Sequence, residues 1–334
     1  MQALFKIIFK SSLAFIAGLL IVSSPIAQAQ VKNVRYSEVV RSLFYAPAYV
    51  AISRGFFKAE GLSVTMTTAQ GGDKSVAALL SNAADIALVG PEVAVYVHNS
   101  ESPDKLKIFA GLTATDGFIL MSRQKIVNFD WKMLKGKDIL GWREGSTPTL
   151  FLDEVLRMHG LDPQRDVHIA NNIAVPARVG SWISGQNQFG IFQEPDVSTM
   201  ERDGTAFAVT SIGKEIGPVD YTVFVATDKY IRENPDIIQK WSNAIYKAEQ
   251  WSATASASDL GKTLQEFFPG VDEKILASAA QRYRTLKIWK STPVIDPQAM
   301  NKFQDVLVHG KVLDNAKRVK FEDIANMDFA RKAK

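Results

Sequence analysis

Cysteine is absent from this sequence of 334 residues. Its absence excludes disulfide bonds, thiolate metal ligands, iron–sulfur clusters, a catalytic cysteine and a cysteine-linked lipid anchor. Histidine is scarce: four occur, and none belongs to an HExxH or HxH motif. The nucleotide-binding motifs GxxxxGK(S/T) and GxGxxG are also missing. We therefore predict that the protein has no metal site and needs no cofactor.

Long apolar runs are also rare. One run of ten apolar residues, 13–22, follows Lys6 and Lys10 and precedes Ala27-Gln28-Ala29. This order is typical of a cleavable secretory signal, whereas a membrane-spanning helix needs about 20 apolar residues. We predict a signal peptide at residues 1–29, cleavage after Ala29 and a free periplasmic protein, since a chain without cysteine folds there without disulfides.

The net charge is close to zero once the two ends of the chain are set aside. The 39 basic and 35 acidic residues give a net charge of +4. Removal of the predicted signal peptide lowers it to +2, and a predicted basic tail at residues 331–334 accounts for three more positive charges. The remaining body is close to neutral, so we predict no nucleic-acid partner.

Strand-like and helix-like patterns alternate along most of the chain. Strands are predicted at 34–39, 63–68, 85–89, 137–142, 167–170 and 189–192, and helices at 46–57, 74–82, 149–159 and 177–184. The alternation is typical of parallel sheets covered by helices, and its recurrence indicates two α/β lobes. The β-prone stretches 108–122 and 220–227 are predicted to connect the lobes, and the chain from Pro235 onward is predicted to be mainly helical.

Several short motifs occur in a distinctive order within residues 34–250. They are Tyr45-Ala46-Pro47, the segment 55–62, Gly72-Asp73, the segment 84–87, Gly90-Pro91-Glu92, the segments 134–137 and 145–148, Glu194-Pro195 and the segment 233–235. In this order and spacing they resemble the periplasmic substrate-binding proteins of ABC importers. The branch that they resemble serves sulfonates, taurine, nitrate and thiamine-pyrimidine or flavin precursors.

The resemblance implies an α/β fold of the two-lobed, type II periplasmic-binding-protein kind. Each lobe would be a parallel-rich sheet flanked by helices, and two crossing strands would form the hinge. Lobe 1 would comprise residues 30–114 and 222–330, and lobe 2, with the hinge strands, residues 115–221. The implied partners are a small-molecule ligand held between the lobes and an ABC permease in the inner membrane. We expect the protein to be a monomer.

Candidate ligand-binding residues follow from this arrangement. Ligands of open parallel sheets bind beyond the carboxyl ends of the strands, where helices begin and present free N–H groups. The helix starts, aromatic residues and polar residues expected at these ends are Phe44, Tyr45, Gly72, Asp73, Gly90, Glu92, Thr115, Ser146, Thr147, Gln193, Glu194 and Tyr221. The same residue types are also ordinary helix caps and core aromatics, so the sequence leaves their individual roles open.

Charged residues near the predicted site point to two kinds of ligand. Acids favour a ligand with N–H donors, and we expect a thiamine-precursor-like pyrimidine or another flat N-heterocycle; these acids are Asp73, Glu92, Asp116 and Glu194. Guanidinium groups favour the alternative of an aliphatic sulfonate, taurine or nitrate; the arginines are Arg41, Arg143 and Arg178.

Two further classes of function share this fold. One is an enzyme similar to pyrimidine synthases, which the missing cysteine, the scattered histidines and the predicted export signal disfavour. The other is a sensor that reports its ligand to a membrane receptor. We predict a transport binding protein rather than an enzyme.

Overall fold

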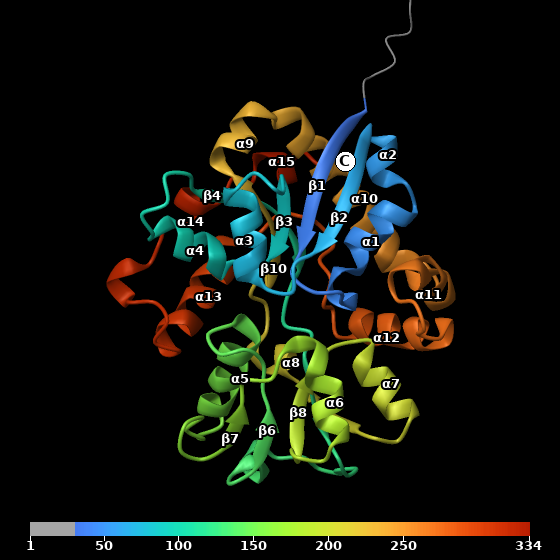
Figure 1. The fold of residues 1–334 in the computed structure, drawn as a ribbon, viewed down its shortest axis with the longest axis vertical. Coiled ribbons are helices and arrows are strands. Elements are labelled where there is room, and N and C mark those ends of the chain that lie inside the picture. Colours follow the sequence, from blue (N-terminus) through green and yellow to red (C-terminus); the bar gives the residue numbers. More distant parts are fainter. Residues whose placement is uncertain (1–30) are drawn as a thin grey trace, which may run out of the picture. The chain divides into compact units, whose positions relative to one another are not determined.

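Two five-stranded mixed sheets organise the chain in a computed structural model, which describes residues 31–334. The predicted signal peptide lies outside the described residues. Figure 1 shows one sheet in the upper half of residues 31–334 and the other in the lower half, each flanked by helices. The prediction of a two-lobed α/β fold is confirmed.

The first sheet is built from both ends of the described chain. Its strands, in spatial order, are β2 (Leu62–Thr68), β1 (Lys32–Glu38), β3 (Ile86–Val89), β10 (Thr222–Thr227) and β4 (Leu106–Thr113). β1 runs parallel to both of its neighbours, and β10 runs antiparallel to both of its own. β3 and β10 are buried at every position, which is why they read as continuous apolar runs rather than alternating ones.

The second sheet repeats this plan. Its strands, in spatial order, are β7 (His168–Ala170), β6 (Asp138–Leu140), β8 (Phe189–Phe192), β5 (Ile119–Ser122) and β9 (Phe207–Ser211). β6 is parallel to its neighbours and β5 is antiparallel to its own. In each sheet the fourth strand, β10 or β5, is the antiparallel one. It is also the strand by which the chain enters that sheet after leaving the other.

Helices connect the strands of each sheet. The helices between the strands of the first sheet are α1 (Ala46–Ser53), α2 (Phe56–Ala59), α3 (Gly72–Leu80) and α4 (Glu92–His98). The second has α5 (Thr147–Met158), α6 (Arg178–Ile183), α7 (Asp196–Arg202) and α8 (Ile212–Ile216). Single 3-10 turns lie at Leu43–Tyr45, Trp131–Leu134 and Val175–Ala177.

The chain after β10 is helical. Its helices are α9 (Asp228–Glu233), α10 (Pro235–Thr254), α11 (Ala257–Leu264), α12 (Glu273–Thr285), α13 (Pro297–His309), α14 (Phe321–Ile324) and α15 (Asp328–Arg331), with 3-10 turns at Gln265–Phe267 and Asn315–Lys317. α10 packs on α1 and β4, whereas α12 contacts α7 and α13 contacts α5. The C-terminal helices thus touch the helices of both sheets.

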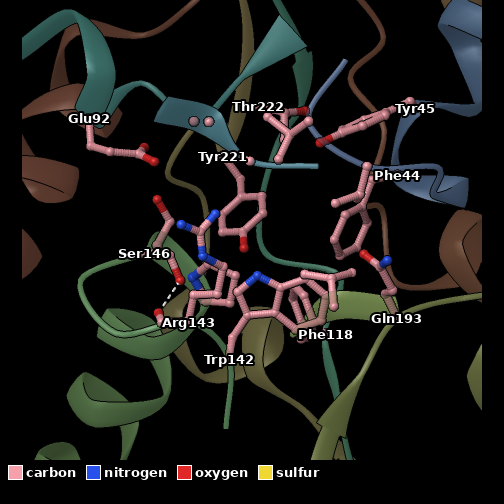
Figure 2. A pocket seen from close by; sticks show the side chains of 18 of the residues that line it. Phe44, Tyr45, Glu92, Phe118, Trp142, Arg143, Ser146, Gln193, Tyr221 and Thr222 are labelled. Carbon is pink, nitrogen blue, oxygen red and sulfur yellow. Dashed lines mark hydrogen bonds between the residues drawn. The ribbon is translucent and has the colours of Figure 1, made fainter. Parts of the chain in front are cut away.

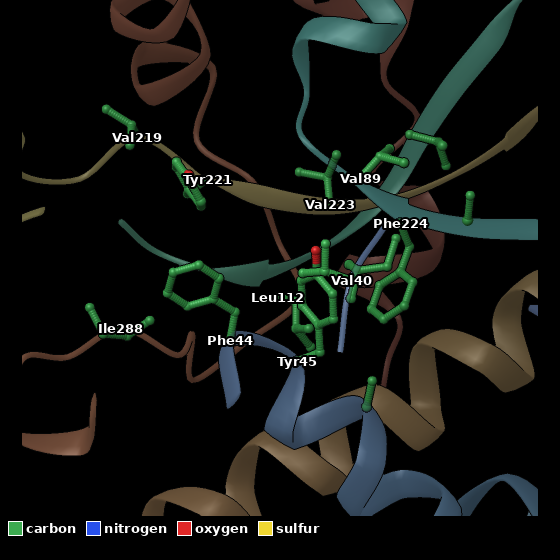
Figure 3. Packing of buried hydrophobic residues seen from close by; sticks show 14 of the residues in the cluster. Val40, Phe44, Tyr45, Val89, Leu112, Val219, Tyr221, Val223, Phe224 and Ile288 are labelled. Carbon is green, nitrogen blue, oxygen red and sulfur yellow. The ribbon is translucent and has the colours of Figure 1, made fainter. Parts of the chain in front are cut away.

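Buried aromatic rings join the first sheet to α10. Trp241 of α10 is fully buried and its ring lies 5.3 Å from Tyr36, 5.5 Å from Phe224 and 4.3 Å from Phe57. Burial of such large rings is a major source of stability for a lobe. The cluster of buried side chains also includes Phe44 and Tyr45, which come from the segment after β1 (Figure 3).

Two predicted elements are divided in the structure. The helix predicted at 46–57 breaks at Gly55, whose φ of 72° interrupts α-helical geometry between α1 and α2. The stretch predicted at 108–122 forms β4 and β5 in different sheets. Within residues 31–334, no helix combines the length and apolarity needed to cross a membrane.

Candidate functional site

A pocket lies where the carboxyl ends of strands from both sheets meet the two segments that join the sheets. It encloses about 650 Å³ of space, part of it open to solvent. Figure 2 shows its labelled side chains around this space. The residues that line it are Val39, Val40, Phe44, Tyr45, Gln70, Gly71, Gly72, Gly90, Glu92, Phe118, Trp142, Arg143, Ser146, Thr147, Pro148, Val175, Gln193, Tyr221 and Thr222.

Glu38, the last residue of β1, holds the segment that carries Phe44 and Tyr45. Its buried carboxylate accepts hydrogen bonds from the Tyr49 hydroxyl at 2.6 Å, the Thr68 hydroxyl at 2.6 Å and Arg41 Nε at 2.8 Å. Burial raises the pKa of Glu38, and these three donors oppose the shift. Arg41 is therefore occupied by Glu38 and by Thr68, and it supports the wall of the pocket rather than lining it.

Aromatic rings form most of one wall. Phe44 stacks on Tyr283 at 5.4 Å and meets the edges of Phe118 at 5.3 Å and Tyr221 at 5.9 Å. Phe118 in turn lies 4.9 Å from Trp142. Rings from both sheets and from the connecting segments thus form one continuous apolar surface, suited to a flat, apolar face of a ligand.

Trp142, which follows β6, is fixed from behind by Arg178 of α6. The guanidinium carbon lies 4.3 Å from the centre of the Trp142 ring, and the guanidinium donates to the backbone carbonyls of Gly141 and Ile191. Burial lowers the pKa of Arg178 to about 9. Arg178 thus orients the ring and does not line the pocket.

Glu92 supplies an acidic group to the pocket. Its carboxylate lies over Gly90, so that a Cβ added to Gly90 would meet Glu92 Oε2 at 2.1 Å. Burial raises the pKa of Glu92, and the nearby Thr147 hydroxyl of α5 opposes the shift, although no hydrogen bond within 3.5 Å joins the two side chains. Oε2 is buried and has no hydrogen-bond partner among residues 31–334. A ligand with an N–H donor would satisfy this oxygen.

Arg143 is the cation at the pocket. It follows β6, and its guanidinium donates to Asp73 in the first turn of α3 at 3.2 Å. Partial burial raises the pKa of Asp73, but the Arg143 guanidinium and the backbone N–H groups at the start of α3 lower it on balance. Both side chains are substantially exposed, so the pair lies at the mouth of the pocket.

The structure brings nine of the twelve candidate residues to the pocket. The nine are Phe44, Tyr45, Gly72, Gly90, Glu92, Ser146, Thr147, Gln193 and Tyr221. Asp73 lies beside the pocket in its ion pair with Arg143. Thr115 donates its hydroxyl to the Gly213 and Gly217 carbonyls, so it ties the two connecting segments together.

Glu194 also lies outside the pocket lining. Its buried carboxylate accepts hydrogen bonds from the Ser198 backbone N–H at 3.0 Å and the Ser198 hydroxyl at 2.8 Å, and Arg282 lies 3.2 Å away. Its backbone N–H donates to the Tyr283 hydroxyl and its carbonyl accepts from the Leu43 N–H. Glu194 therefore joins the start of α7 to α12 and to the segment before α1.

Besides Gly71, Trp142, Arg143 and Pro148, which were also not among the twelve candidates, six lining residues were missed: Val39, Val40, Gln70, Phe118, Val175 and Thr222. Five of them lie within a few residues of a strand end, which is the signal that could have found them. Val175 lies in a 3-10 turn after β7, and its position depends on the packing of that turn. Among residues 31–334 no group of three or more His, Asp or Glu side chains could hold a metal ion.

The chain matches a known family and a curated relative over most of its length. Residues 44–255 match the NMT1/THI5-like family, and the chain is 37% identical over 300 residues to the putative binding protein YtlA of Bacillus subtilis (strain 168), covering 90% of this chain and 89% of the relative. The chain belongs to the NMT1/THI5-like family, which confirms the resemblance.

Solved structures show the same fold at low sequence identity. The chain superposes with a TM-score of 0.72 on the alkanesulfonate-binding protein SsuA from Xanthomonas axonopodis pv. citri bound to MOPS, at 15% identity, covering 89% of this chain and all of that one (100%). It has the same TM-score of 0.72 with the periplasmic nitrate-binding protein NrtA from Synechocystis PCC 6803, at 14% identity, covering 90% and 88%. These relatives carry the names of binding proteins, not of enzymes.

Proposed function

We propose that this protein is the solute-binding component of an ABC importer, which captures a small molecule between its two lobes and delivers it to a membrane permease. The family, the fold and a pocket between the two sheets that is lined by five aromatic rings support this proposal. The hinge would lie in residues 114–118 and 217–221, where the chain passes between the sheets, and closure about it would enclose the ligand.

The ligand that we propose is a flat N-heterocycle such as an aminopyrimidine. The observation that carries this proposal is the buried Glu92 carboxylate oxygen without a partner beside a wall of aromatic rings. The alternative is a sulfonate, taurine or nitrate, and the names of two similar structures, an alkanesulfonate-binding and a nitrate-binding protein, favour a sulfonate or nitrate. Of the three arginines that favoured an anion, Arg41 and Arg178 are bonded into the scaffold, and Arg143 is already paired with Asp73.

A thermal-shift and calorimetric panel tests the ligand class. An aminopyrimidine at 100 times its dissociation constant should add about 2.7 kcal/mol to the free energy of unfolding. Glu92→Gln should weaken its binding roughly 10- to 100-fold, because a hydrogen bond to a charged group contributes about 1.5–3 kcal/mol. Glu144→Gln, the same change at an exposed position outside the lining, is the matched control. Stabilisation by taurine or nitrate with none by heterocycles would reject the ligand class while keeping the binding function.

The binding function itself has a separate test. Ligand recovered from the protein after unfolding should be chemically unchanged and stoichiometric, and the loaded protein should stimulate ATP hydrolysis by its importer in vesicles. Recovery of a converted product would instead identify an enzyme. Sequencing the N-terminus of the protein recovered from a periplasmic extract tests the proposed export, with Gln30 expected first.

A further inference from the structure

A second cavity lies on the other side of the connecting segment that begins at Ala114. It encloses about 880 Å³ of partly open space and shares no lining residue with the pocket described above. Its walls come from α10, from the end of α12 and from the segment that follows α12; they include Glu249, Arg284, Lys287, Trp289 and Lys290. The protein therefore has a second recess beside the segment that begins at Ala114, lined by both apolar and charged side chains.

Glu249 is the most unusual residue of this cavity. It is 1% exposed, and neither of its carboxylate oxygens has a hydrogen-bond partner among residues 31–334. The nearby Lys290 ammonium is paired with Asp220. Burial raises the pKa of Glu249 well above its ordinary value, although the Lys290 charge opposes the shift. A buried carboxyl group with both oxygens free is costly to retain unless something else contacts it.

Arg284, a basic residue of the same cavity, also has a buried polar atom without a hydrogen-bond partner. One end of its guanidinium donates to the carbonyls of Ser252 at 3.0 Å and Ala255 at 2.8 Å, at the end of α10. Its Nε is buried and without a hydrogen-bond partner in the described part of the chain. No ion pair within 4.0 Å joins Arg284 to Glu249 in residues 31–334. The exposed Lys287 adds a second positive charge at the rim.

A buried carboxyl group and a buried guanidinium N–H without partners line one cavity, which points to a ligand that carries both an ammonium group and an acidic group. A bound ammonium group would favour the ionised form of Glu249. We propose that the cavity binds a small zwitterion, with its ammonium group on Glu249 and its acidic group on Arg284 Nε and Lys287. A ligand with a single charge would satisfy one group and leave the other buried without a partner, which disfavours it. This site is independent of the ligand proposed for the first pocket.

The wall of this cavity is also part of the hinge. The Lys290 backbone N–H donates to the Leu112 carbonyl at 3.0 Å, and the Ala114 N–H donates to the Ile288 carbonyl at 2.7 Å. Trp289 lines the cavity, and its indole N–H donates to the Leu43 carbonyl, next to Phe44 of the first pocket. The second site therefore lies against the backbone that connects the lobes.

Calorimetric titration of the purified protein tests the proposal. The probes are glycine, β-alanine and γ-aminobutyrate, which separate the two charges by increasing lengths, with methylammonium and acetate as single-charge controls. We expect saturable binding of at least one zwitterion and at least tenfold weaker binding of both controls. Absence of saturable binding of every zwitterion at millimolar concentration, or equal binding of a control, overturns the proposal.

Variants locate the binding. Glu249→Gln should weaken zwitterion binding at least tenfold, and Ala253→Trp, at an exposed lining position of α10, should block the cavity without disturbing the core. Glu266→Gln, the same chemical change at an exposed position outside the cavity, should leave the affinity unchanged. Trp142→Ala, in the first pocket, should also leave it unchanged. Loss of binding in Trp142→Ala with retention in Glu249→Gln would assign the zwitterion to the first pocket and overturn the proposal.

Discussion

The Arg143 guanidinium lies 3.2 Å from the Asp73 carboxylate, and the two residues follow strands of different sheets. This ion pair therefore bridges the mouth of the cleft. Since 43% of the Arg143 side chain and 65% of the Asp73 side chain are exposed, solvent and salt weaken the attraction. We therefore propose that the pair favours the closed arrangement of the two lobes slightly rather than holding it.

Breaking this pair should speed ligand release modestly. For Arg143→Gln we expect the dissociation rate to rise about 1.5- to 5-fold, since exposed pairs contribute about 0.2–1 kcal/mol. The difference from the parent protein should shrink as salt is raised, and stopped-flow measurements with Asp73→Asn and the double variant would isolate the pair. Additive effects of the two single changes would show that the pair is not coupled.

Gly117 should be intolerant of any side chain. A Cβ there would lie 2.0 Å from Phe44 Cε1, so Gly117→Ala forces the ring out of its stacked position on Tyr283. Such overpacking costs about 1–3 kcal/mol, and the displaced ring should also weaken ligand binding. Denaturant unfolding and titration measure the two effects. Gly180→Ala, where no atom lies within 4 Å of the added Cβ, is the control and should be neutral or stabilising.

The Tyr49 hydroxyl should matter for both stability and binding. It donates to Glu38 Oε2 at 2.6 Å and accepts from the Ser42 N–H, so Tyr49→Phe leaves a buried carboxylate oxygen without its donor. We expect a loss of about 1–3 kcal/mol in the free energy of unfolding and weaker binding, because the segment bearing Phe44 loosens. Tyr96→Phe removes a buried hydroxyl that has no partner in residues 31–334 and should cost little. Equal losses in both variants would contradict the assigned role of Tyr49.

Asp116 should make stability depend on pH. Burial raises its pKa to about 7, although the Phe118 N–H and the Tyr221 hydroxyl oppose the shift, whereas an unfolded aspartate titrates near 3.9. The folded state therefore holds its proton more tightly. The contribution is fully present below about pH 4 and is lost as the pH rises through about 7, with an upper magnitude of about 4 kcal/mol. In Asp116→Asn the fall in stability between pH 4 and 7 should be shallower than in the parent, measured by urea unfolding. Identical pH profiles would show that Asp116 is ionised throughout this range.

The sequence by itself determined the local architecture and where ligands could approach. Apolar strands alternating with helical segments define the two sheets, and Gly71-Gly72, Gly90-Pro91 and Ser146-Thr147 mark the helix starts that line the pocket. These features depend on neighbours in the chain, through hydrogen-bond periodicity and backbone freedom, so a single sequence reveals them.

Only the tertiary structure decided which charged side chains line the pocket. Glu92 and Glu194 both follow apolar strands, yet Glu92 lines the cleft while Ser198, Arg282 and the start of α7 engage Glu194. Arg178 likewise turns away to bind two carbonyls behind Trp142. The partners that fix these side chains lie on other elements, and in the case of Arg282 almost 90 residues away. The direction of a charged side chain is therefore set by contacts that exist only once the distant elements have packed together.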